Sequence, residues 1–191
     1  MKLKGLKKVL AFVLFLYSFL PLKAENRALL IGIGNYNHPA FNLNGPILDV
    51  KLIEELALKI GFQKPQIKII INSQATRSAI LSSINDWLIK GVGPRDKIFF
   101  YFSGHGTQVE DTNSDENDGC DEALVPFDLF RNGHRVLITD DEINTLFNQI
   151  EASQRLIIID SCHSGTATRN LKILPIKGLA RYGKLLVDTK C

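Results

Sequence analysis

Short apolar runs alternate with helical segments along most of this chain, and that alternation constrains the fold more than any other sequence feature. Four largely apolar runs end at glycine or polar residues: 27–34, 66–71, 96–104 and 155–160. Such runs are typical of strands whose two faces are both buried. Three segments with helical spacing of apolar residues lie between them: 45–62, 76–91 and 139–150. Strands separated by helices predict an α/β fold with a mostly parallel sheet.

Two of the predicted helices carry recognisable start signals. Thr76 is placed to cap the second, and Thr139 with Glu142 has the spacing of a capping box at the start of the third. The acidic stretch 110–122 shows no such periodicity, and it predicts an exposed loop.

The first 24 residues predict a secretory signal peptide. They open with lysines, continue through an apolar run from Val9 to Leu20 and end in Leu22-Lys23-Ala24. The run is shorter than the ~20 residues that a membrane span needs. We therefore expect a secreted or periplasmic protein with no stable membrane span after signal removal, with an uncleaved anchor as the alternative.

Charge and cysteine content exclude other classes of protein. The chain has a formal net charge of +3, and removal of the five lysines in residues 1–24 leaves −2. No basic stripe with interleaved aromatic residues follows, so nucleic acid is not an expected partner. The three cysteines have neither zinc-site nor disulfide-framework spacing. Their odd number leaves at least one thiol free or paired between molecules.

Two predicted strands end in reactive side chains. His105 follows the run 96–104 in "YFSGHGTQ", and Cys162 follows the run 155–160 in "DSCHSG". Ligands bind outside the carboxyl ends of parallel strands, so these residues face one crevice if their strands are neighbours. An imidazole favours the reactive thiolate and protonates a leaving amine. The amides of Gly106 and Cys162 are candidate oxyanion donors. A buried core thiol and a loop histidine are the alternatives.

The two motifs together resemble the metacaspase branch of the caspase-like cysteine peptidases. "RALLIGIGNY", "GPILDV" and "DGCDEALVPFD" add to this resemblance, which covers about residues 26–165. It implies a caspase-like three-layer α/β/α sandwich with a catalytic large-subunit domain at 25–170. It also implies a cysteine endopeptidase that needs no cofactor for its chemistry and acts on proteins or peptides.

The resemblance assigns further residues. Substrates cut after Arg or Lys are expected to be held by Asp49, Ser103 and Asp160. A solvated helix residue is the alternative for Asp49, and a carboxylate bound to local backbone amides is the alternative for Asp160. Calcium as an activator is implied at Asp121, Asp140 and Asp141, although acidic residues are also favoured in the first turn of a helix.

The chain departs from the family in its length. Only 29 residues follow Cys162, and segment 171–191 is too short for the usual small subunit. A shortened chain, a fragment and a large-subunit-only form remain open. The missing strands predict an open sheet edge that favours self-association. A catalytically weak binding or scaffold domain and a calcium-responsive module are the alternative functions. If specificity is basic, self-cleavage is expected at Arg169, Lys172, Lys177 or Arg181.

Overall fold

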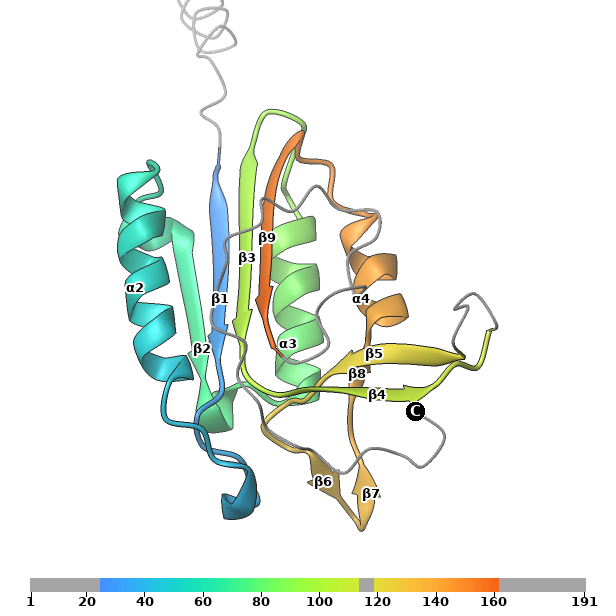
Figure 1. Ribbon diagram of the computed structural model, residues 1–191. Coiled ribbons are helices and arrows are strands. Elements are labelled where there is room, and N and C mark those ends of the chain that lie inside the picture. The colour runs from blue at the N-terminus through green and yellow to red at the C-terminus, as the bar shows by residue number, and fades with distance from the viewer. Residues whose placement is uncertain (1–24, 114–118, 162–191) are drawn as a thin grey trace, which may run out of the picture.

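A four-stranded parallel sheet in the order β2-β1-β3-β9 forms the centre of the protein (Figure 1). The computed structural model describes residues 25–113 and 119–161. The expected signal peptide, Cys162 and the C-terminal segment lie outside them. The strands are β1 Arg27–Gly32, β2 Ile67–Ile71, β3 Lys97–Ser103 and β9 Gln154–Asp160. All four confirm strands predicted from the sequence.

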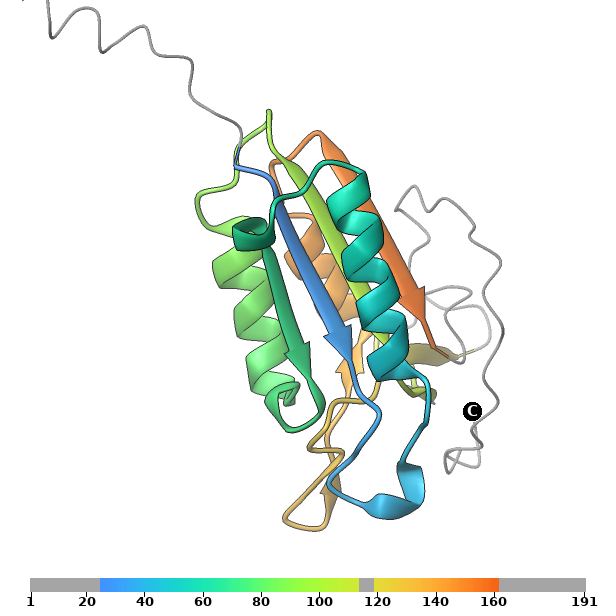
Figure 2. The same cartoon turned by 90° about the vertical axis from the view of Figure 1, so that its left-hand side faces the viewer.

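Helices cover both faces of this sheet, which gives the predicted three layers. Figure 2 shows α2 on one side of the sheet and α3 on the other. Alternate side chains of β3 point to opposite faces. Phe99 and Tyr101 pack towards α2, whereas Phe100 and Phe102 pack in the core cluster that includes α3 and α4 side chains. Because both faces are buried, the central strands are continuously apolar rather than alternating.

The helices begin where the sequence predicts. Their bounds are α2 Pro46–Lys59, α3 Arg77–Ser83 and α4 Asp140–Phe147. Thr76 accepts a hydrogen bond from the Ala79 amide, and both hydrogen bonds of the Thr139–Glu142 capping box are present. The predicted helix 76–91 changes character midway, since α3 continues as a π-helix, η4. The η segments are η1 Pro39–Phe41, η2 Lys64–Gln66, η3 Asn72–Gln74 and η4 Ile84–Ile89.

A second, antiparallel sheet lies beyond the carboxyl end of β3, and the sequence did not predict it. Its strands are β4 Gly106–Glu110, β5 Cys120–Leu124 and β8 Ile138–Thr139, in the order β4-β5-β8. A hairpin of β6 Phe130–Arg131 and β7 His134–Arg135 lies beside it. The prediction of an exposed loop at 110–122 is wrong at its C-terminal end, because Asp121 and Glu122 are buried in β5.

Helix α2 lies unusually close to the end of β1. A Cβ atom added at Gly32 would be 2.6 Å from Val50 Cγ2 and 2.8 Å from the Pro46 carbonyl oxygen. The absence of a side chain at Gly32 therefore lets the first turn of α2 approach the carboxyl edge of the sheet. No helix within residues 25–113 and 119–161 has the length and apolar character to cross a bilayer.

Gly32→Ala is expected to lower the free energy of unfolding by about 1–3 kcal/mol, because the new methyl group overpacks this contact. Gly93→Ala is the matched control, since the nearest atom to its added Cβ would be 3.9 Å away. Urea unfolding of both variants checks the expectation. Equal stabilities of the two variants would show that the close packing of α2 against Gly32 does not contribute to stability.

Candidate active site

The two predicted reactive residues follow neighbouring strands. Strands β3 and β9 are parallel and pair in register, with Ser103 opposite Asp160, and the Gly104 amide donates to the Asp160 carbonyl oxygen at 3.3 Å. His105 and Cys162 each come two residues after one member of this pair. The condition set by the sequence, that the two strands be neighbours, is confirmed. Cys162 lies outside the described residues, so its pairing with His105 stays a prediction.

His105 is held in one orientation by main-chain and aromatic contacts. Its side chain is buried, and its Nε2 lies 2.9 Å from the carbonyl oxygen of Phe41. A carbonyl oxygen only accepts hydrogen bonds, so Nε2 carries the proton of the neutral ring and Nδ1 is left to accept one. The His105 amide donates to the Tyr36 hydroxyl at 2.8 Å, and the two rings are 5.2 Å apart.

Burial lowers the pKa of His105, because desolvation disfavours the imidazolium ion, while the hydrogen bond to Phe41 opposes this effect. The folded protein therefore binds this proton less well than the unfolded chain does, whose histidines titrate near pH 6.5. Stability contributed by neutral His105 is present above about pH 6.5 and is lost as the pH falls below it.

Replacing His105 with asparagine is expected to make stability less dependent on pH. As the pH falls below 6.5, the free energy of unfolding of the parent is expected to decrease by up to about 1.4 kcal/mol per pH unit more than that of His105→Asn. Urea unfolding of both proteins at pH 7.5 and pH 5.5 measures this difference. Identical losses would mean that the imidazole is not desolvated in the folded state.

The predicted substrate-binding residues come together on the α2 side of the same edge. The Ser103 hydroxyl donates to Asp49 Oδ2 at 3.0 Å, which joins β3 to the first turn of α2. The Tyr101 hydroxyl donates to Asp160 Oδ2 at 3.4 Å. Burial, followed by the charge of Asp160, raises the pKa of Tyr101, so its hydroxyl stays a neutral donor.

Tyr101 was missed by sequence reasoning. It lies two residues before Ser103 on β3, and residues two apart on a strand share a face. Four oxygen-bearing side chains, Asp49, Tyr101, Ser103 and Asp160, thus surround the carboxyl end of β3. We call Asp49 and Asp160 the acidic pair. Tyr101 and Ser103 are their hydroxyl partners.

The predicted calcium ligands lie around the start of α4. Asp140 and its neighbours Asp121 and Glu122 are buried, and burial followed by the charges of Asp121, Glu122 and Asp141 raises the pKa of Asp140 to about 6. Within the described part of the chain, Asp140 Oδ1 and Glu122 Oε2 are buried without hydrogen-bond partners. Hard carboxylate oxygens suit calcium, and buried like charges are costly without a cation.

Residues 25–113 and 119–161 contain no three acidic, histidine or cysteine side chains gathered closely enough to enclose a metal ion. The donor chemistry thus fits calcium, but the described residues do not complete a site. The side-chain amide of Asn113 donates a hydrogen bond to Asp141 Oδ2 at 2.6 Å, so this oxygen of the predicted ligand already has a partner.

The remaining predicted residue, Gly106, is buried at the first position of β4. The Val125 amide donates to the His105 carbonyl oxygen at 3.0 Å, which fixes the chain just before Gly106. Cys120 is disulfide-bonded. Because the chain has three cysteines, a nucleophilic role for Cys162 requires that it be the free thiol.

The fold is a caspase-like three-layer α/β/α sandwich, with His105 just beyond β3, Asp160 at the end of β9 and Asp49 in the first turn of α2. Residues 26–170 match the family model described as "Metacaspase, peptidase C14 domain". The chain belongs to the metacaspase family.

Curated relatives and a solved structure agree with this assignment. The chain is 39% identical to Metacaspase-1 of Pyricularia oryzae and 41% identical to Metacaspase-1 of Sclerotinia sclerotiorum, over 152 residues in each case. These alignments cover 75% of this chain but only 37% and 34% of the relatives, so the chain spans about a third of their length. The crystal structure of protein GSU0716 from Geobacter sulfurreducens is similar with a TM-score of 0.59 and 27% identity, covering 78% of this chain and 57% of that one.

Proposed function

We propose that this chain is a cysteine endopeptidase that cuts after Arg or Lys, with Cys162 as nucleophile and His105 as acid and base. The observation that supports the proposal is the in-register pairing of β3 with β9, because His105 follows the first of these strands in the sequence and Cys162 follows the second. The family assignment supports the reaction class.

In the proposed reaction the Cys162 thiolate attacks the carbonyl carbon of the scissile amide, and the oxygen becomes an oxyanion. The amides of Gly106 and Cys162 donate to that oxyanion. The C–N bond then breaks, and the imidazolium of His105 gives its proton to the leaving amine. Water attacks the resulting thioester while His105 takes a proton from it, which releases the carboxylate product and the thiol.

The proposed specificity follows from the acidic pair. Asp49 and Asp160 place two carboxylates at the same edge, and each accepts one hydrogen bond from a hydroxyl of β3. Carboxylates form charge-assisted hydrogen bonds with guanidinium and ammonium groups, which are stronger than hydrogen bonds between neutral groups. A positively charged substrate side chain would be attracted by both carboxylates.

Hydrolysis of short peptide reporters tests the proposal. The parent is expected to release product from reporters ending in Arg or Lys, and not from matched reporters ending in Leu or Asp. Cys162→Ala, with the same fold by circular dichroism, is expected to be inactive. Cleavage that survives this substitution would contradict the proposed nucleophile. A folded parent that cleaves no reporter, with or without calcium, would favour the binding or scaffold alternative.

The proposal includes calcium as an activator rather than a reactant. Asp121, Asp140 and Asp141 would contribute ligands to the ion, and the site would be completed from outside the described residues. The charge of the ion would relieve the repulsion between these carboxylates. The support is the pair of buried carboxylate oxygens at Asp140 and Glu122.

Thermal unfolding with and without millimolar calcium tests this part. The parent is expected to melt several degrees higher with calcium, and Asp140→Asn is expected to lose most of the shift. Asp86→Asn serves as the control, because Asp86 is an exposed acid paired with Lys90. An equal shift in all three proteins would place calcium elsewhere, and no shift in the parent would remove calcium from the proposal.

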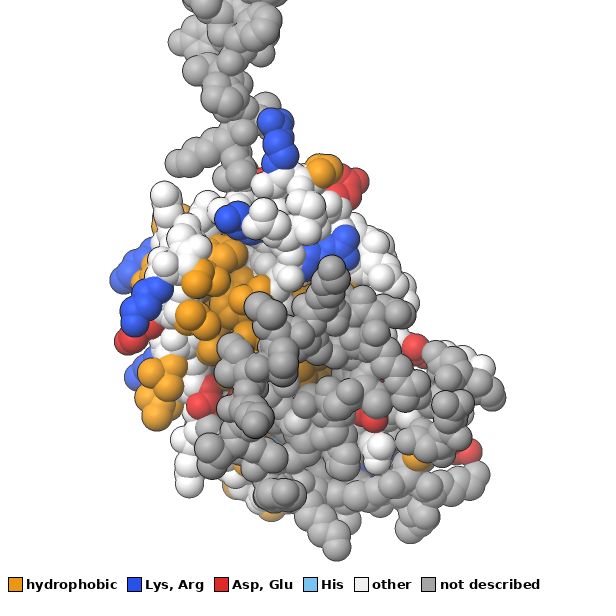
Figure 3. All heavy atoms as spheres, turned by 45° about the horizontal axis from the view of Figure 1, so that its top comes forward, with side chains coloured by type: hydrophobic (Ala, Val, Ile, Leu, Met, Phe, Trp, Pro, Cys, Tyr) orange, Lys and Arg blue, Asp and Glu red, His pale blue; other side chains and the backbone are white. Residues whose placement is uncertain are grey.

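Self-association is proposed through the β9 edge and the adjoining flank of α2. Among the described strands β9 pairs only with β3, and Leu156 and Ile158 are half-buried. Helix α2 and the residue after it expose an apolar stripe of Leu48 at 60%, Leu52 at 56% and Ile60 at 45%. Apolar side chains gather on this side of the molecule (Figure 3). Such patches are typical of interfaces.

Sedimentation of the parent beside Leu52→Glu tests the self-association. A concentration-dependent dimer is expected for the parent and a monomer for the variant. A monomeric parent at all concentrations would contradict this part of the proposal.

Export is proposed from residues 1–24. Intact mass of the protein recovered from the periplasm or medium is expected to match cleavage after Ala24. A full-length mass in the cytoplasmic fraction would contradict it.

A further inference from the structure

Three aromatic rings from distant parts of the chain meet beside His105. They belong to His38 and Phe41, in the segment between β1 and α2, and to Phe130 of β6. The ring centroids of His38 and Phe41 are 5.4 Å apart, and Phe130 is 6.0 Å from each of them. His38 is exposed, and Phe41 and Phe130 are half-buried. We call these three residues the aromatic cluster.

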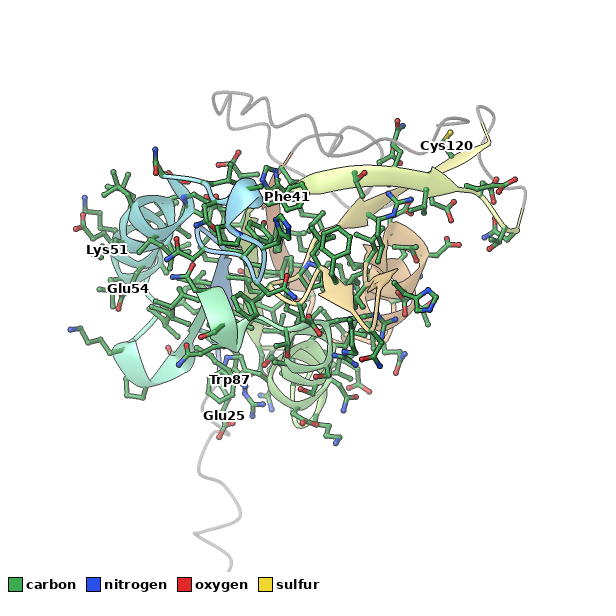
Figure 4. All side chains as sticks on the ribbon, turned by 90° about the horizontal axis from the view of Figure 1, so that it is seen from below. Glu25, Phe41, Lys51, Glu54, Trp87 and Cys120 are labelled. Atoms are coloured by element: carbon green, nitrogen blue, oxygen red, sulfur yellow. The ribbon has the colours of Figure 1, made fainter. Side chains whose placement is uncertain are left out.

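The aromatic cluster lies directly against the histidine. The Phe41 carbonyl oxygen binds His105 Nε2, and the Phe41 ring meets the imidazole edge-on at 6.4 Å. In Figure 4, which looks onto the edge of the sheet that carries His105, Phe41 lies between the α2 residues Lys51 and Glu54 on one side and Cys120 on the other.

The acidic pair and the aromatic cluster lie on opposite sides of the sheet edge. Tyr101, which binds Asp160, packs in the core cluster on the α2 face. Phe41 and Phe130 pack against the core cluster of the opposite face, which also includes Tyr36 and Phe102. A peptide that occupies both regions must therefore pass the His105 imidazole on its way.

The aromatic cluster is held rigidly, as a preformed subsite requires. The Asn37 amide donates to the Phe127 carbonyl oxygen at 3.1 Å, and its side-chain amide donates to the Phe130 carbonyl oxygen at 2.9 Å. The Leu43 amide closes the segment by donating to the Gly34 carbonyl oxygen at 2.7 Å. These bonds fix the two halves of the cluster to one another.

We propose that the aromatic cluster is the subsite for the peptide that leaves, and that it selects aromatic or large aliphatic side chains directly after the scissile bond. This inference depends on the proposed function, in which the acidic pair holds the residue before the bond. His105 protonates the leaving amine, so the residues after the bond lie at the imidazole and continue away from the acidic pair. Half-exposed rings offer apolar contact area to such side chains.

Internally quenched peptides test the inference, because they carry residues on both sides of the bond. All have Arg before the bond, and they differ only in having Phe, Leu, Gly or Asp after it. The parent is expected to cleave the Phe and Leu peptides with kcat/KM about tenfold above the Gly peptide, the range that one apolar contact gives. Phe130→Ala is expected to reduce that ratio to about 2 while leaving the Gly peptide nearly unchanged.

Two further variants separate a subsite from a structural role. His38→Ala changes an exposed side chain and is expected to lower the ratio about twofold to threefold without affecting folding. Arg131→Ala, beside Phe130 in the same hairpin, is the control and is expected to keep the parent ratio. If the substitutions lower kcat/KM equally for all four peptides, their effect is structural and the inference is overturned.

The outcomes also distinguish this inference from the proposed function. Cleavage after Arg with the same kcat/KM for all four peptides would overturn the aromatic subsite and leave the peptidase intact. No cleavage of any peptide by the folded parent would overturn both.

Discussion

Replacing His105 with alanine is expected to lower kcat towards an Arg reporter by about 10³-fold, within the range of general acid–base catalysis. The loss removes the proton donor to the leaving amine and the group that favours the thiolate. KM is expected to change little, because the acidic pair that binds the substrate side chain is untouched. Steady-state kinetics of parent and variant measure the two constants separately.

His134→Ala is the matched control for this loss, since His134 is an exposed histidine in the hairpin strand β7. It is expected to keep the parent kcat. A His105→Ala protein that folds and retains more than about a tenth of the parent kcat would show that this imidazole is not the acid and base, because a lost general acid–base costs at least ~100-fold.

Neutralising the acidic pair is expected to remove the preference for basic substrates. Asp160→Asn or Asp49→Asn should each lower kcat/KM for an Arg reporter by about 100-fold, because breaking a desolvated charge pair costs 2–5 kcal/mol. Ser103→Ala should have a smaller effect, since it removes one neutral hydrogen bond to Asp49 and no charge.

The ratio of kcat/KM between Arg and Leu reporters is the quantity to measure. It is expected to fall in both carboxylate variants and to stay unchanged in Asp86→Asn, an exposed acid on η4. If the Arg-to-Leu ratio is the same in Asp49→Asn, Asp160→Asn and the parent, basic substrate side chains are bound by other residues.

The central sheet could be predicted because its two middle strands, β1 and β3, are buried on both faces. Phe99 and Phe100 point to opposite sides of the sheet, and both are fully buried. Such strands appear in the sequence as continuous apolar runs, and the capped helices between them require parallel crossovers. The sequence could not show that β3 and β9 are adjacent strands, because strand order depends on contacts between distant segments.

The second sheet could not be predicted from apolar periodicity. Strand β8 has two residues, and β5 contains Asp121 and Glu122, which are buried despite their charges. Charged residues normally indicate an exposed segment. Here a group of carboxylates is buried together, and the sequence pattern gives no sign of that.

The contacts that orient His105 could not be predicted from the sequence either. The Phe41 carbonyl oxygen belongs to the main chain, so the identity of residue 41 does not reveal its role. Tyr36 was within the quoted "RALLIGIGNY" motif, but only the structure brings its hydroxyl to the His105 amide. Tyr101, in contrast, could have been found from strand alternation, because it shares a face with Ser103.

The central claim is that His105 and Cys162 act on one another across the ends of β3 and β9. The rate of Cys162 alkylation by iodoacetamide as a function of pH, followed by mass spectrometry, tests this claim most directly. In the parent the rate is expected to rise with an inflection at least about one unit below 8.5, the ordinary thiol pKa. In His105→Ala the inflection is expected to return to about 8.5. The same profile in both proteins would contradict the account.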